Sequence, residues 1–578
     1  MSRVVNAVSP ILTRLYGGET AQALLPRLLG AIADARPRIP AGRGGEFDQR
    51  DSLLITYPDM VQESGKPPLR TLLEFSEEHL RGVVSCVHIL PFFPSSSDDG
   101  FSIVDFRSVD PALGTWEDIG GFRRSFRVMI DAVFNHVSVS SAWFQGFLRD
   151  EPDSRDMFVV VPAGSDLSRV VRPRSLPLLT GFNTPSGHRL VWTTFSRDQA
   201  DLNYASPAVL ARIVETLMFY VERGADLVRL DAIAYIWKEV GTRCIHLPQA
   251  HLIVQLFRAI LDVVAPHVAL VTETNVPHEE NVSYFGDGAN EAQLVYNFTL
   301  PPLVLNAFST ESADALTRWV EGLSPPSSRT TFLNFLASHD GIGVVPAKGI
   351  LSEADIQMLV DGTLARGGQV SFKAGPDGAL SPYELNISYW DALGDPGGGG
   401  PLDIRVQRFL AAHAIMLALQ GVPALYFHSL FGSSGWVEGA TITGSKRAIN
   451  RQKCERSLLE GELGDAASPR ARVFCGLKSL LSARGSTHCF HPQAAQRVLR
   501  AGASVFAIVR DAPDGGERVL CLHNVSGEKR VARVDLGEVY GRLPGELKDI
   551  VAGRVHAVTD SRGVALEPYQ VAWLQGHA

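Results

Sequence analysis

The feature that most constrains this chain is a repeated alternation of short apolar runs with stretches of helical periodicity. Eight such runs, rich in β-branched residues, recur along most of the 578 residues. Alternation of this kind is typical of parallel strands joined by helical crossovers. Eight units predict an α/β fold with a closed (β/α)8 barrel, or TIM barrel. The predicted strands are residues 53–57, 83–91, 128–135, 226–231, 269–274, 294–298, 331–338 and 424–428.

Two of the gaps between these strands are too long for ordinary barrel loops. About 90 residues separate the third and fourth strands and about 85 separate the seventh and eighth, whereas structureless loops that long are rare in compact domains. We therefore predict two inserted subdomains, domain B (about residues 138–200) and the lid (about residues 345–403). Barrels carry their active sites at the carboxyl ends of the strands, so we expect both insertions to lie over the site.

The two ends of the chain lack the strand–helix alternation of the predicted barrel. Leu and Ile recur at helical spacing between residues 11 and 35, and Pro and Gly interrupt the pattern from 37 to 45, which predicts a helical arm at residues 1–50. After residue 484 short strand-like runs with Gly and Pro turns replace the alternation. They predict a small antiparallel β domain at residues 485–578, which leaves residues 51–484 for the barrel and its insertions.

Composition limits the class of partner. The chain carries 54 Lys and Arg against 62 Asp and Glu, a net charge of −8, whereas nucleic-acid binders need a basic face. No apolar run is long and unbroken enough to span a bilayer, and the N-terminus lacks a signal-peptide pattern. The six cysteines form no CxxC pair, which favours reduced thiols. We expect a cytoplasmic enzyme with small-molecule partners, which binds neither nucleic acid nor membrane.

Polar clusters follow four of the predicted strands. Because strand ends meet at the mouth of a barrel, these residues converge in space although they are far apart in the sequence. Three carboxylates around one pocket are costly unless their charge is used. Glycosidic bond chemistry uses paired carboxylates, one as nucleophile and one as general acid and base. The clusters are Asp131 to His136, Arg229 to Asp231, Thr272 to Asn275 and Ser338 to Asp340.

The order of these segments and the residues in them resemble those of the α-amylase superfamily of retaining glycoside enzymes, and within it the sucrose phosphorylase group. The likeness is greatest to the glucosylglycerate phosphorylases, and it runs from about residue 52 to the C-terminus. The segments that carry it are residues 97–101, 135–138, 172–174, 229–232, 237–239, 272–275, 338–343 and 449–451.

The resemblance implies roles for the charged residues at the strand ends. Asp231 would be the nucleophile that forms a covalent β-glucosyl ester, and Glu273 would be the general acid and base. Asp340 would hold the sugar ring and stabilise the transition state. Arg229 lies on the same face of its strand as Asp231, so it would keep the nucleophile ionised and aimed.

The resemblance also implies contacts with the glucose unit. His136 and His339 would hydrogen-bond its hydroxyl groups. Asp98 and Arg451 would clamp the hydroxyls at the far side of the ring, and Phe101 would stack on its apolar face.

Phosphate requires cationic contacts, for which the Arg fork is suited. Arg174 in domain B and Tyr383 in the lid match family positions near the acceptor, and Arg172 is a further candidate. We expect both insertions to close over the site and to alternate between phosphate and acceptor shapes.

Asn135 matches a position that binds calcium in many amylases. Domain B has no acidic cluster of the right kind, and the resembling phosphorylases use no metal. We therefore expect no metal and no cofactor, with inorganic phosphate as co-substrate. The run at residues 272–280 differs from the sucrose-type segment and favours glucosylglycerate. Alternatively, its last residues and Asn281 cap the next helix.

The leading hypothesis is reversible phosphorolysis of 2-O-α-glucosylglycerate, with retention, to α-glucose 1-phosphate and glycerate. The first alternative is a sucrose phosphorylase, with fructose as acceptor, or a related α-glucoside phosphorylase. An oligosaccharide α-glucosidase or transglucosidase would need an open cleft and a path for water. A binding protein on an inactive barrel is disfavoured by the complete set of Asp231, Glu273 and Asp340. The assembly is expected to be a monomer or a homodimer.

Overall fold

The structure is a computed structural model that describes residues 1–42, 46–374, 379–558 and 563–577. Parts of the predicted arm, lid and C-terminal domain therefore lie outside the described residues. Among the described helices, none combines the length and the apolarity that crossing a bilayer requires.

Eight parallel strands close into a barrel in the order β1-β16-β12-β11-β10-β9-β4-β3. The predicted fold class is confirmed, and each predicted strand overlaps one strand of the ring. Helices cover the outside of the ring and side chains fill its inside, so the strands are buried on both faces. The strands are β1 (Leu53–Thr56), β3 (Cys86–Ile89), β4 (Arg127–Ala132), β9 (Leu227–Leu230), β10 (Ala269–Thr272), β11 (Leu294–Tyr296), β12 (Thr331–Asn334) and β16 (Val422–Tyr426).

Helices surround the barrel, and several of them begin on proline. Pro68, Pro207, Pro248 and Pro469 each open a helix, where the missing N–H costs no hydrogen bond and the ring presets the backbone. The helices around the ring are α3 (Pro68–His79), α4 (Trp116–Phe122), α6 (Pro207–Glu222), α7 (Pro248–Val264), α8 (His278–Val282), α9 (Leu300–Thr310), α10 (Asp314–Glu321), α13 (Leu402–Ala418), α16 (Arg456–Gly464) and α17 (Pro469–Gly485).

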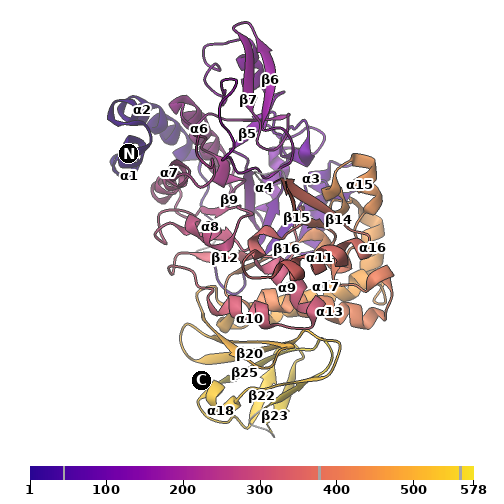
Figure 1. Ribbon diagram of the computed structural model, residues 1–578. Coiled ribbons are helices and arrows are strands. Elements are labelled where there is room, and N and C mark those ends of the chain that lie inside the picture. The colour runs from indigo at the N-terminus through magenta and orange to yellow at the C-terminus, as the bar shows by residue number, and fades with distance from the viewer. Residues whose placement is uncertain (43–45, 375–378, 559–562, 578) are drawn as a thin grey trace.

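The first long gap contains a small subdomain that rises from one end of the barrel (Figure 1). Strand β5 (His136–Ser138) pairs antiparallel with β8 (Gln199–Asp201) at its base. Helix α5 (Ala142–Leu148) and a hairpin of β6 (Leu179–Thr184) and β7 (Gly187–Trp192) complete it.

Within the second long gap, the described residues form a three-stranded antiparallel sheet and several helices. Strand β15 (Leu380–Asn386) lies between β13 (Ile342–Gly343) and β14 (Gln369–Ala374). Helices α11 (Glu353–Ala365) and α12 (Tyr389–Ala392) flank the sheet in the chain. Because β13 follows Asp340 almost directly, this sheet is tied to the end of barrel strand β12.

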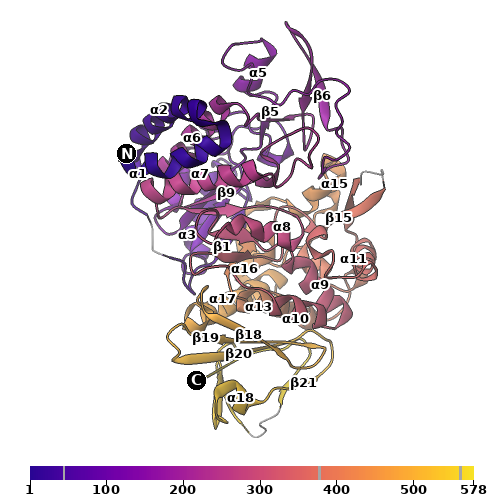
Figure 2. The same ribbon diagram turned by 60° about the vertical axis from the view of Figure 1, so that its left-hand side comes forward.

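The N-terminal segment forms two helices, α1 (Ser2–Tyr16) and α2 (Gly18–Ala35), which lie beside α7 and α6 (Figures 1 and 2). Helix α1 begins earlier than the predicted pattern, because Val4 and Val8 join Leu12 on its buried face. Gly17, with φ of 81°, separates the two helices in a conformation that suits glycine.

The C-terminal segment forms an antiparallel sheet at the end of the barrel opposite domain B (Figure 2). Its strand order is β18-β19-β20-β25-β22-β23. The strands are β18 (Ala495–Arg500), β19 (Val505–Asp511), β20 (Glu517–Asn524), β22 (Glu546–Asp549), β23 (Arg554–Ala557) and β25 (Val571–His577), with a separate pair of β21 (Arg530–Ala532) and β24 (Val564–Leu566) and a short helix α18 (Leu536–Tyr540).

One buried arginine joins these parts at the amino-terminal end of the barrel. Arg484, near the end of α17, is 1% exposed. Its guanidinium donates to carbonyl oxygens that precede β1 and β16, and to one that precedes the C-terminal sheet. The acceptors are the carbonyls of Gln49, Asp51, Leu417, Gly421 and Phe490.

We expect Arg484→Met to lower the free energy of unfolding by about 3 kcal/mol or more, because each buried carbonyl left without a donor costs about 1–3 kcal/mol. Urea unfolding followed by circular dichroism measures the change. Arg50→Met is the control, because the Arg50 side chain is 75% exposed. Equal midpoints for the two variants would contradict the role of Arg484.

Candidate active site

A single pocket at the carboxyl ends of the barrel strands collects most of the residues predicted for the site. It is lined by side chains from the barrel, from domain B and from the lid. The predicted residues that line it are Asp98, Phe101, His136, Arg174, Asp231, Glu273, His339, Asp340 and Tyr383.

Arg229 on β9 lies between two carboxylates at the base of this pocket. The pairing of β4 with β9 sets Asp131 directly beside Arg229. Arg229 Nη1 lies 2.8 Å from Asp231 Oδ1 and also donates to Asp131, which accepts from His88 at 2.8 Å as well. Burial would raise the pKa of Asp131, but Arg229 and His88 lower it to about 2. Asp131 therefore stays ionised, and its negative charge partly neutralises the guanidinium of Arg229.

The division of Arg229 between two carboxylates affects the pKa of Asp231. Burial raises the pKa of Asp231 above its ordinary value, and Arg229 opposes this shift, while Asp131 adds to it. The predicted contact of Arg229 with Asp231 is present, but Arg229 offsets the effect of burial on the pKa of Asp231 only in part. The reason is that the same guanidinium also serves Asp131.

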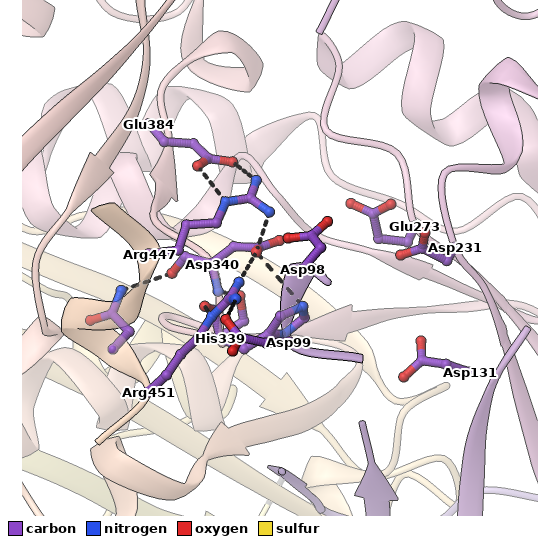
Figure 3. Close-up of polar contacts among 12 residues, drawn as sticks. Asp98, Asp99, Asp131, Asp231, Glu273, His339, Asp340, Glu384, Arg447 and Arg451 are labelled. Carbon is purple, nitrogen blue, oxygen red and sulfur yellow. Dashed lines mark hydrogen bonds and ion pairs between the residues drawn. The ribbon is translucent and has the colours of Figure 1, made fainter. Parts of the chain in front are cut away.

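Glu273 follows strand β10 and lies beside Asp231 in the pocket (Figure 3). Its Oε2 accepts a hydrogen bond of 3.0 Å from the backbone N–H of Ala232, the residue after Asp231. Ala232 has φ of 49°, an uncommon conformation for a residue with a side chain. Burial raises the pKa of Glu273 to about 7; the negative charges of Asp231 and Asp340 add to this rise, and Arg229 opposes it.

Asp340 follows β12 and is held by two arginines. Arg447 Nη1 lies 2.7 Å from Asp340 Oδ1, and Arg451 Nη2 lies 3.2 Å from the same oxygen (Figure 3). Burial would raise the pKa of Asp340, but Arg447, His339 and Arg451 hold it well below its usual range. Arg447 lines the pocket and was not predicted. Arg447 stands shortly before the recognised segment at residues 449–451, and this nearness in the sequence could have pointed to it.

The two predicted histidines and Phe101 pack against one another. His136 Nε2 lies 3.0 Å from the carbonyl oxygen of Phe101. The ring of Phe101 stacks on His339, with centroids 5.0 Å apart and planes 5° from parallel. Burial lowers the pKa of His339 to about 3, so its imidazole is neutral at pH 7.

Of the two residues predicted to clamp the far side of the sugar, only Asp98 lines the pocket. Arg451 donates to Asp99 and to the carbonyl oxygen of His339, whereas Asp98 accepts from Gln199 at 3.0 Å. Asp98 and Asp99 both have positive φ, 55° and 46°. This left-handed turn sends the two neighbouring side chains to different partners. Asp98 lines the pocket, while Arg451 lies behind Asp340.

Arg174 lines the pocket beside two aromatic rings. Its guanidinium carbon lies 5.8 Å from the ring centre of Phe195 and 5.8 Å from that of Tyr383. No carboxylate of the described residues pairs with it, so its donors remain available to an anion. The predicted role of Arg172 in binding phosphate or acceptor needs correction. Its Nη2 donates to the carbonyl of Leu176 within domain B, and the residue does not line the pocket.

Several lining residues were not predicted. Phe195 and Gln199 come from the end of domain B, Tyr235 from the turn after Asp231, Asn275 from the segment after β10 and Glu384 from the lid. Asn275 lies within a recognised motif and Tyr235 lies shortly after one, which was a usable signal. The others lie in insertions, where spacing in the sequence says little about position in space.

The end of the 272–280 run has structural contacts rather than contacts with the pocket. His278 packs between Trp319 and Phe332, and Asn281 donates to the carbonyl of Tyr296. Glu280 pairs with Arg243 and His246. These contacts favour the alternative in which these residues support the helix α8.

A lysine lies at the position of the amylase calcium site. Lys238 Nζ donates to Asn135 Oδ1 at 2.7 Å and lies 2.5 Å from Asp201 Oδ2. Calcium requires about six to eight oxygen ligands, and a buried ammonium in direct contact with two of the available oxygens excludes such a shell. The residues present therefore do not fit a calcium ion. Instead, Lys238 links the end of β4 to β8 at the base of domain B.

We compared the chain with known proteins. The family model "Alpha amylase, catalytic domain" matches residues 81–344. The glucosylglycerate phosphorylase of Allomeiothermus silvanus is 51% identical and covers 95% of each chain. That of Escherichia coli is 42% identical and covers 98% of this chain and 99% of its own. Among solved structures, sucrose 6F-phosphate phosphorylase from Thermoanaerobacter thermosaccharolyticum is 26% identical with a TM-score of 0.71, over 82% of this chain and 94% of that one.

This chain belongs to the glucosylglycerate phosphorylase family within the α-amylase superfamily. The resemblance inferred from the motifs is confirmed. The chain is a glycoside phosphorylase, which is a kind of hexosyltransferase, and phosphorylases act on a sugar substrate and phosphate.

We expect Lys238→Met to lower the free energy of unfolding by about 3–5 kcal/mol, because it leaves the buried Asp201 without its cationic partner. Urea unfolding measures the change. Lys529→Met is the control, because Lys529 and its partner Glu567 are 62% and 64% exposed, and exposed pairs contribute about 1 kcal/mol or less. A calcium chelator should leave the midpoint of the native protein unchanged, and a lower midpoint would contradict our reading of Lys238.

Proposed function

We propose that this protein catalyses the reversible phosphorolysis of 2-O-α-glucosylglycerate to α-glucose 1-phosphate and glycerate, with retention. One observation carries the proposal: the unpaired guanidinium of Arg174 shares a pocket with the carboxylates of Asp231, Glu273 and Asp340. Three carboxylates serve glycosyl transfer, and a free guanidinium is suited to an anionic co-substrate. The relatives with 51% and 42% identity are glucosylglycerate phosphorylases, which supports glycerate as the acceptor.

In the first step Asp231 attacks the anomeric carbon as the bond from that carbon to the glycerate oxygen breaks. Glu273 gives its proton to the departing oxygen, and its pKa of about 7 keeps a large protonated fraction available near neutral pH. The product is a covalent glucosyl ester on Asp231. Asp340, ionised through Arg447 and Arg451, stabilises the positive charge that develops on the sugar.

In the second step a phosphate oxygen attacks the anomeric carbon and the bond to Asp231 breaks. Glu273 takes the proton of the incoming phosphate, which restores the starting protonation state. Two inversions at the same carbon give net retention. Arg174 and Tyr383 contact the phosphate or glycerate in this proposal, while His136, His339, Asp98 and Phe101 hold the glucose.

Cellular location and assembly belong to the proposal as well. All six cysteines are free thiols and five of them are buried, which supports a reducing compartment such as the cytoplasm. Either a monomer or a homodimer agrees with a pocket built from one chain.

The function is tested by incubating the protein with glucosylglycerate, sucrose and maltose, each with and without phosphate. We expect glucose 1-phosphate from glucosylglycerate and only when phosphate is present. The variant Asp231→Ala is the control and should form no product, because the covalent step is lost. Release of glucose at the same rate with and without phosphate would contradict the proposal.

The pKa of Glu273 predicts an alkaline limb in the pH profile. Because the protonated carboxyl acts as the acid, kcat/KM for glucosylglycerate at saturating phosphate should fall above pH 7, by about tenfold per pH unit at the limit. α-Glucosyl fluoride, whose leaving group needs no proton, should show no such limb. A midpoint near the ordinary Glu value of 4.5 would contradict the assignment.

A further inference from the structure

A row of alternating charges runs from the wall of the pocket to the residues behind it. It runs from Glu384 to Arg447, Asp340, Arg451 and Asp99, and Figure 3 shows the contacts between successive members. The five residues come from four separate segments of the chain. The row therefore ties the lid to the loops after the barrel strands.

Arg447 is the member that joins the lid to the site. Its Nε donates to Glu384 Oε2 at 3.0 Å and its Nη2 donates to Glu384 Oε1, a two-pronged contact. Its third nitrogen, Nη1, lies 2.7 Å from Asp340 Oδ1. The Glu384 side chain is only 1% exposed, so its charge has no solvent to compensate for a lost partner.

Strand β15 carries Glu384 and, directly before it, Tyr383. Tyr383 is 9% exposed and lines the pocket, and its carbonyl accepts from the N–H of Val344 at 3.1 Å. The close approach of β15 depends on Gly341, because a Cβ there would come within 3.0 Å of the Glu384 Cβ. Glu384 thus adds a side-chain contact to the strand whose Tyr383 lines the pocket.

A glycoside phosphorylase must let phosphate reach its covalent intermediate and keep water away, since both attack the same carbon. We propose that the Arg447–Glu384 pair is a latch that determines this specificity: it holds β15 and Tyr383 against Asp340, so that the intermediate reacts with phosphate rather than with water. This inference rests on the proposed function. Both latch residues are positioning residues, because they act through Tyr383 and Asp340.

The test is the ratio of glucose to glucose 1-phosphate formed from glucosylglycerate at saturating phosphate. This ratio compares two fates of one intermediate, so an inactive fraction of a variant does not change it. Glu384→Gln keeps the shape of the side chain and removes its charge. We expect the ratio to rise roughly tenfold or more, the effect of losing a charge-assisted hydrogen bond.

Two further variants separate the latch from a general disturbance of the lid. Leu380→Ala lies on the same strand but is 65% exposed, so the ratio should stay at the wild-type value. Arg447→Lys keeps the charge but cannot bridge both carboxylates. It should raise the ratio as Glu384→Gln does, and also raise KM for glucosylglycerate, because Asp340 loses a partner.

A wild-type ratio in Glu384→Gln overturns the latch, and so does an equal rise in Leu380→Ala. These outcomes leave the proposed function intact as long as the wild-type protein forms glucose 1-phosphate. Release of glucose by the wild-type protein regardless of phosphate is a different result, which overturns the proposed function itself.

Discussion

The buried guanidinium of Arg229 is the interaction on which the site depends. A cation inside a barrel requires carboxylates, and the register of β4 with β9 supplies Asp131 from the neighbouring strand. The remaining charge of Arg229 aims Asp231 at the pocket. Burial raises the pKa of Glu273 to about 7, and Arg229 opposes this rise. Arg229 therefore acts both on the geometry of the nucleophile and on the proton affinity of the acid.

Cationic side chains join the separate parts of this molecule. Lys238 joins the barrel to domain B where related folds use a metal ion, and Arg447 joins the lid to Asp340. Arg484 connects the barrel to the C-terminal sheet through backbone carbonyls. A covalently attached ammonium or guanidinium group forms such a link without binding a metal ion from solution. It does require that its partners stay buried and charged, so each of these links connects local chemistry to the stability of the whole chain.

Much of the site could be predicted because the chemistry lies at strand ends. Asp231, Glu273 and Asp340 follow strands that the apolar pattern identifies, and barrel closure brings such ends together. The errors concern side chains whose partners depend on loop conformation. Nothing in the sequence tells that the backbone at Asp98 and Asp99 is left-handed, and this conformation decides which of them meets Arg451. Arg172 and Arg174 are two residues apart, yet only Arg174 faces the pocket.

The sequence by itself determined the barrel, the order of its strands and the carboxylates at its mouth, since periodicity and strand-end motifs are local properties. It also determined the family, because those motifs occur in a fixed order. Only the tertiary structure decided how charge is distributed among them. The sharing of Arg229, the place of Lys238 and the contact of Arg447 with both Glu384 and Asp340 all join segments far apart in the chain. Such pairings depend on the register of neighbouring strands or on how the insertions fold back over the barrel, and no local pattern encodes them.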